Sequence, residues 1–116
     1  MDSRAAVTPP PPYYCVVFTS RRVDAHGADY AATSERMTEL ARSMPGFLGV
    51  ESMRDAEGVG ITVSYWQSEE AIRNWREHAE HRVAQKDGRH RFYQWYELRV
   101  CRVERATSFR SARPDR

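Results

Sequence analysis

Four strand-like stretches are separated by two stretches of helical periodicity between residues 13 and 105, and this order constrains the fold more than any other feature. Aromatic and β-branched residues favour strands at 13–19, 47–54, 60–66 and 92–105. Apolar residues recur at helical spacing from about 28 to 44 and again after Ser68. The order β-α-β-β-α-β is the ferredoxin-like arrangement. We therefore predict a ferredoxin-like α+β domain with one antiparallel four-stranded sheet.

The first predicted strand is apolar on both of its sides. Its alternating residues are Tyr14, Val16 and Phe18 on one side and Tyr13, Cys15 and Val17 on the other. Two helices cover only one face of such a sheet, so the second face would expose an apolar patch, and patches of this kind usually mark an interface. We expect two chains to pack sheet on sheet as a homodimeric α/β barrel.

The two ends of the chain lack any periodic pattern. Pro9 to Pro12 favour an extended polyproline II arm, so residues 1–12 are predicted to be a disordered Pro-rich arm. Residues 110–116 are predicted to be a disordered basic tail. The folded domain is expected to span residues 13–109.

Charge and hydropathy indicate which classes of partner to expect. The net charge is +2, and this excess of positive charge lies in the last ten residues rather than along the predicted domain. The absence of a basic stripe on the domain argues against a nucleic-acid partner. No apolar run approaches the roughly 20 residues that cross a bilayer, and the first residues lack the apolar region of a signal peptide. We expect a cytoplasmic protein with no membrane partner, in which Cys15 and Cys101 are free thiols.

The second predicted helix carries the residues most suited to a functional site. Trp75, His78 and His81 are spaced by three residues, which places them near one edge of a continuous helix. The predicted buried face consists of Ala71, Ile72, Trp75, Ala79 and Val83. Phe18, Tyr65 and Trp95 are expected in the sheet beneath, so the sequence predicts an aromatic-walled pocket for a flat, conjugated ligand.

Each of these residues also has a structural explanation. Trp75 on an apolar stripe is often simply part of the core, since its burial is strongly favourable. His78 could be a core histidine with satisfied hydrogen bonds or an acid, base or ligand, and His81 could be solvated. A metal site formed by His78 and His81 with Glu77, Glu80 or His90 is a further alternative, although the spacing is one residue short of the zincin pattern. We therefore predict no bound metal.

Several motifs resemble the antibiotic biosynthesis monooxygenase family. They are Met44–Glu51 (MPGFLGVE), Ile61–Trp66 (ITVSYW), Ser68–Ile72 (SEEAI) and Asn74–His78 (NWREH). The likeness covers about residues 13–109. It implies a homodimeric α/β barrel with one cavity per subunit. Members of the family include cofactor-independent oxygenases, in which an electron-rich aromatic substrate itself reduces dioxygen, and also haem-degrading enzymes.

The haem-degrading members use an Asn on the first strand, a Trp on the second helix and a His ten residues after that Trp. Trp75 matches this pattern, but Gln85 stands at the histidine position, and the first strand offers Thr19 and Ser20 in place of Asn. Haem binding or degradation is thus the alternative, with His78 or His81 as the iron ligand.

The resemblance and the residues together predict an oxidoreductase that acts on a small phenolic or quinone-like molecule and dioxygen without a cofactor. In this hypothesis His78 is the general base on a substrate hydroxyl, and Trp75 and Tyr65 stack on the ring. Asn74 polarises an oxygen atom. Phe18, His81 and Trp95 complete the substrate-binding residues. A non-catalytic ligand-binding or stress-associated dimer is the third alternative.

Overall fold

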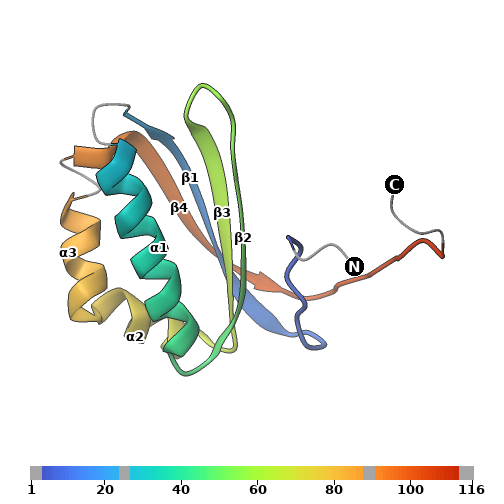
Figure 1. Ribbon diagram of the computed structural model, residues 1–116. Helices are drawn as coiled ribbons and strands as arrows, with labels where there is room; N and C mark the ends of the chain where they lie inside the picture. Colours follow the sequence, from blue (N-terminus) through green and yellow to red (C-terminus); the bar gives the residue numbers. More distant parts are fainter. Residues whose placement is uncertain (1–3, 24–26, 88–90, 113–116) are drawn as a thin grey trace.

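A computed structural model describes residues 4–23, 27–87 and 91–112 of the chain (Figure 1). Four strands and three helices follow one another in the order β1, α1, β2, β3, α2, α3, β4. Their bounds are β1 Tyr13–Arg22, α1 Gly27–Ser43, β2 Phe47–Arg54, β3 Val59–Trp66, α2 Glu69–Glu77, α3 Ala79–Asp87 and β4 Tyr93–Val103.

The strands form one antiparallel sheet in the order β2-β3-β1-β4, and the helices lie on one face of it (Figure 1). This is the ferredoxin-like strand order, so the predicted α+β fold class is confirmed. The prediction of a homodimer concerns a second chain and stays a prediction.

The core lies where α1 and α2 pack on the middle of the sheet. Trp66 at the end of β3 is fully buried, and its ring stacks on that of Trp75 with 6.2 Å between the centroids. Ser68 caps α2 by accepting a hydrogen bond from the Ala71 backbone N–H at 3.1 Å, which satisfies one of the free donors at the helix start. This cap and the two tryptophans fix α2 against the sheet.

Strand β1 is longer than its composition predicts. The sequence favours a strand only over residues 13–19, but Arg21 and Arg22 also belong to β1, and the Arg22 backbone N–H donates to the Gly58 carbonyl at 2.9 Å. The register between β1 and β4 shifts at Arg21/Arg22. Val100 and Cys101, two consecutive apolar residues, interrupt the alternation along β4, a pattern typical of a bulge or a change of burial partner, but the register with β1 is unbroken there, so no bulge occurs at this point.

The second predicted helix is two helices with a break at His78. The backbone of His78 is extended, with φ −61° and ψ 132°, and this turns α3 out of the line of α2. Helical spacing counted across the break therefore fails, which explains why Val83, predicted to be buried, is 63% exposed. The side chain of Ala79, also predicted to be buried, lies outside the described residues.

The sheet face that points away from the helices is largely apolar. It receives the odd-numbered residues of β1 and the residues paired with them, because side chains alternate along a strand. Exposed hydrophobic side chains on this face are Met53, Ile61 and Trp95. The three helices of the described part of the chain all lie on the opposite face of the sheet (Figure 1).

Residues 4–12 contain no helix or strand but do contact the domain. The backbone N–H of Ala6 donates to the Glu51 carboxylate at 2.9 Å, and the Thr8 hydroxyl donates to the Tyr13 hydroxyl at 2.9 Å. Within the described ranges, no helix is long and apolar enough to cross a membrane.

Candidate functional site

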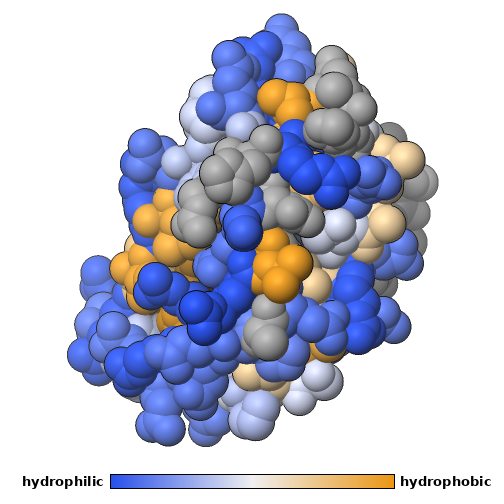
Figure 2. Space-filling model, turned by 90° about the vertical axis from the view of Figure 1, so that its left-hand side faces the viewer, coloured by the Kyte–Doolittle hydropathy of each residue, from blue (hydrophilic) through white to orange (hydrophobic). Residues whose placement is uncertain are grey.

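A cavity of about 230 Å³ lies between the helix layer and the sheet. Its walls are mainly aromatic and aliphatic, and they include Phe18, Tyr30, Trp66, Trp75, Phe92, Tyr93, Tyr96 and Leu98. Hydroxyl groups of Thr33, Ser34, Thr38 and Ser64 supply scattered polar contacts. The outer surface of the helix layer is mostly hydrophilic with small hydrophobic patches (Figure 2). The cavity is partly open to solvent, and a largely apolar pocket with a few polar groups is the usual form of a small-molecule site.

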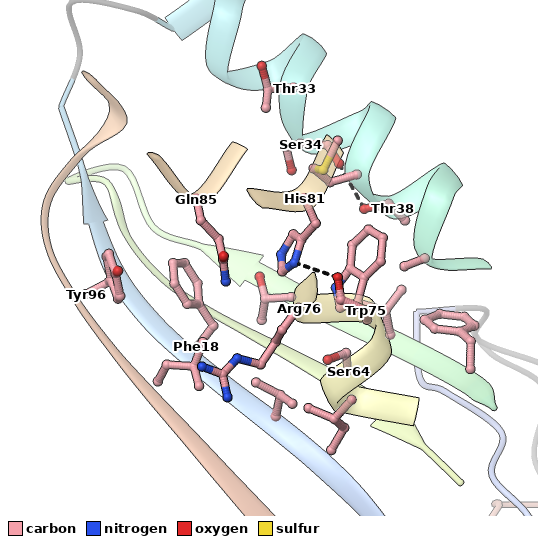
Figure 3. Close-up of a pocket in the computed structure, with 18 of the residues that line it drawn as sticks. Phe18, Thr33, Ser34, Thr38, Ser64, Trp75, Arg76, His81, Gln85 and Tyr96 are labelled. Carbon is pink, nitrogen blue, oxygen red and sulfur yellow. Dashed lines mark hydrogen bonds between the residues drawn. The ribbon is translucent and has the colours of Figure 1, made fainter. Parts of the chain in front are cut away.

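Strand alternation decides which predicted residues reach this cavity. Phe18 and Tyr96 point toward the helices and line it (Figure 3). Tyr65 and Trp95 are on the opposite parity of β3 and β4, so they lie on the other face of the sheet, outside the cavity. Their expected position beneath the second helix is therefore wrong.

Tyr65 is instead part of a polar cluster on that other face. Its hydroxyl donates to the Glu51 carboxylate at 2.6 Å, and its ring meets that of Tyr13 edge to face. Burial, followed by the contact with Glu51, raises the pKa of the Tyr65 phenol. Tyr65 thus stays protonated and is tied to the sheet.

Trp75 and His81 pack directly against each other in the cavity. The two rings are stacked, with 4.2 Å between centroids and 17° between planes. The His81 Nδ1 atom lies 3.1 Å from the Trp75 backbone carbonyl oxygen (Figure 3). The break at His78 makes this contact possible, because in a continuous helix residues six apart lie on different sides.

These contacts set the protonation of His81. Burial lowers its pKa to about 4; the hydrogen bond with the Trp75 carbonyl opposes this effect, and the charges of His78 and Arg76 add to it. A carbonyl can only accept a hydrogen bond, so the Nδ1 atom carries the proton and the Nε2 atom keeps its lone pair. His81 is thus a neutral imidazole with a free acceptor atom at neutral pH.

His78 and Asn74 lie outside the cavity. His78 is at the C-cap of α2, with its ring centroid 6.0 Å from that of Trp75. Its Nδ1 atom is buried and has no hydrogen-bond partner among the described residues. Asn74 is exposed on the outer side of α2. The structure therefore brings together Phe18, Trp75 and His81, but not His78 or Asn74.

The cavity also contains residues that sequence reasoning missed. Arg76 and Gln85 line it from α2 and α3 (Figure 3). At another part of the wall, the Tyr30 hydroxyl accepts from Arg54 at 3.1 Å and lies 3.4 Å from the Tyr93 hydroxyl. Burial, followed by this contact with Tyr30, raises the pKa of Tyr93, so it stays a neutral phenol. Alternation in β4 could have identified Tyr96, but no pattern identifies Arg76.

No group of three or more His, Cys, Asp or Glu side chains could hold a metal ion within residues 4–23, 27–87 and 91–112. His90, one possible ligand in the sequence hypothesis, lies outside these ranges. Glu80, another, accepts two hydrogen bonds from Arg36 on α1, at 3.2 and 3.3 Å.

Residues 13–87, which include β1 and all three helices, match the antibiotic biosynthesis monooxygenase family. The chain belongs to this family. The matched segment contains Phe18, Trp75 and His81, so the cavity of this monooxygenase-family domain is built mostly from family sequence. The predicted resemblance is confirmed.

Individual relatives agree with the family assignment. The chain is 51% identical over 102 residues to the uncharacterised protein YqjZ of Bacillus subtilis strain 168, covering 88% of this chain and 89% of YqjZ. The solved structure of SnoaB, a cofactor-independent oxygenase from Streptomyces nogalater, is similar with a TM-score of 0.72 at 13% identity, covering 83% of this chain and 97% of SnoaB. Protein SO0527 from Shewanella oneidensis gives 0.70 at 7% identity, covering 79% and 91%. At such low sequence identity, the similarity to these two structures supports the fold of this chain and nothing further.

Proposed function

We propose that this protein is a cofactor-independent, monooxygenase-like oxidoreductase that acts on a small phenolic or quinone-like aromatic molecule. The observation that carries the proposal is the neutral His81 imidazole, held on Trp75 inside an aromatic cavity. Family membership supports an oxygenase role, and the similar fold of SnoaB is described as that of a cofactor-independent oxygenase.

In the proposed reaction the cavity binds the ring and His81 handles the proton. Phe18 and Tyr96 supply apolar surface for a flat ring. The His81 Nε2 atom accepts a hydrogen bond from the substrate hydroxyl. Electron transfer from the ring to dioxygen makes that hydroxyl far more acidic, so even an imidazole with a pKa of about 4 can take its proton. One oxygen atom enters the product and the other leaves as water, with all electrons supplied by the substrate.

This proposal moves the role of base from His78 to His81. His78 was the residue indicated by spacing along one helix, but it sits at the helix break, outside the cavity lining. Trp75 keeps its predicted place in the site, where it holds His81. We propose no role in substrate binding for Asn74, Tyr65 or Trp95.

We also propose that the protein acts as a homodimer in the cytoplasm, joined through the open face of the sheet. The hydrophobic side chains of Met53, Ile61 and Trp95 support this, because a large apolar surface on a small domain favours association. A second copy of the same sheet would cover them.

Oxygen uptake with a panel of hydroquinones, naphthols and matched methyl ethers tests the proposed activity. We expect uptake with free hydroxyl compounds, none with the ethers, and no loss on treatment with a metal chelator. Lack of uptake across the panel would contradict the oxygenase proposal and favour a ligand-binding protein. A Soret band on adding hemin, lost in His81→Ala, would favour the haem alternative.

A further inference from the structure

We propose that the aromatic ligand of this cavity carries an ionised carboxylate and that Arg76 binds it. The inference rests on the proposed function and specifies its substrate class. Among the described residues that line the cavity, Arg76 is the only one with a formal charge at neutral pH, and no acidic side chain lines it. The cavity therefore suits an acidic aromatic molecule better than a basic one.

The Arg76 guanidinium is free to bind a ligand. In a continuous helix Glu80, four residues on, would be its natural ion-pair partner. Because α2 ends at Glu77, that spacing is lost, and Glu80 pairs instead with Arg36 of α1 at 3.2 Å. Across the described residues no ion pair or hydrogen bond to the Arg76 guanidinium occurs.

The position of Arg76 relative to His81 matches a hydroxylated acid. Figure 3 shows the Arg76 side chain extending from α2 toward the strand that carries Phe18. Its charge acts on His81, whose pKa it helps to lower. A cation and a neutral acceptor thus line the same cavity, and they complement a carboxylate and a hydroxyl on one ligand. A guanidinium binds a carboxylate through two parallel hydrogen bonds, which also fixes the orientation of the ring.

A second pair of arginines adds positive potential near another part of the cavity. The guanidinium carbons of Arg22 and Arg54 lie 5.1 and 5.5 Å from the centre of the Tyr30 ring, and Tyr30 lines the cavity. The Nε atom of Arg22 is buried and has no hydrogen-bond partner among the described residues. These charges disfavour a cationic ligand and favour an anion.

The helix dipole offers another reason for a cation at this position, since Arg76 is in the last turn of α2. That explanation does not require the side chain to reach the cavity. Arg73, three residues earlier on the same helix, is exposed like Arg76 but does not line the cavity, so it provides a matched control for loss of a positive charge from α2.

Calorimetric titration with para-coumarate and its methyl ester tests the inference, because the two ligands share a phenolic ring and differ in the ionised carboxylate. We expect the wild-type protein to bind the acid at least about 10-fold more tightly than the ester. Arg76→Gln should abolish this preference while changing the affinity for the ester by less than about twofold. Arg73→Gln should retain the full preference.

Each other outcome has a definite meaning. Equal wild-type affinity for acid and ester, or a preference that survives Arg76→Gln, overturns the carboxylate assignment. Loss of both ligands in Arg76→Gln, with an unchanged melting temperature, also overturns it. If the ester binds and the acid does not, the inference fails while the proposed function stands. If neither ligand binds, the inference fails, and oxygen uptake with the hydroquinone and naphthol panel decides the proposed function separately.

Discussion

His81 is attached to Trp75 in two ways: its ring stacks on the indole at 4.2 Å, and its Nδ1 atom donates to the Trp75 backbone carbonyl at 3.1 Å. The stack restricts the tilt of the imidazole, and the hydrogen bond fixes its rotation and tautomer. The Nε2 lone pair is therefore held in one orientation before any ligand binds, which is the arrangement that favours catalysis by positioning.

Replacement of Trp75 should cost stability as well as function. Trp75 is 9% exposed and stacks on both Trp66 and His81. We expect Trp75→Ala to lower the free energy of unfolding by about 3–5 kcal/mol, because it leaves a large cavity in the core. Urea denaturation measures this loss. A change below about 1 kcal/mol would contradict the packing described for α2.

The pKa of His81 predicts a pH dependence of stability. Its folded pKa of about 4 is below the ordinary value of 6.5, mainly because of burial. The contribution of neutral His81 to the free energy of unfolding is fully present above pH 6.5. It falls as the pH drops toward 4, because the unfolded state binds the proton more readily than the folded state does. The loss should be on the order of 2–3 kcal/mol.

The control for this prediction is His81→Asn, in which the free energy of unfolding should fall less between pH 6.5 and pH 4 than it does in the wild type. Titration of the His81 ring protons by NMR gives the pKa directly. A midpoint near 6.5 would show that the ring is solvated and not held in the cavity.

Gly46 fixes the approach of β2 to α2. Its φ is +86°, and a Cβ atom at this position would lie 2.7 Å from the Cβ of Ala71. Gly46→Ala should therefore destabilise the fold by about 1–3 kcal/mol, through both the backbone strain and the clash. Gly27→Ala is the matched control, since nothing lies within 4 Å of its Cβ position. Equal thermal stability of the two variants would contradict this geometry.

The proposed homodimer predicts that a charge on the open sheet face separates the subunits. Ile61 is 48% exposed on that face, so Ile61→Asp should convert a dimer to a monomer in sedimentation velocity experiments. Val83→Asp, on the exposed side of α3, should leave the dimer intact. A wild-type monomer at micromolar concentration would refute the homodimer.

The sequence predicted the fold because each strand is rich in aromatic and β-branched residues and each helical segment has apolar residues at helical spacing. Alternation along β1 correctly placed Phe18 toward the helices. The same rule could have shown that Tyr65 and Trp95 face away, since both pair with odd-numbered residues of β1.

The break at His78 could not be predicted from helical spacing. The segment 69–87 reads as one amphipathic helix, and His78 has no Pro or Gly beside it to indicate a change of direction. Only tertiary packing, with α3 turned back over the cavity, shows that His81 rather than His78 stacks on Trp75 and lines the cavity. The choice between two histidines three residues apart thus depended on one backbone torsion.

Turnover of His81→Ala and His78→Ala with the best phenolic substrate tests this choice most directly. The proposed role of the Nε2 atom predicts that His81→Ala lowers kcat by about 100-fold or more, with a smaller change in KM. His78→Ala should keep most of the wild-type kcat. A wild-type rate in His81→Ala, or a large loss in His78→Ala alone, would contradict the account.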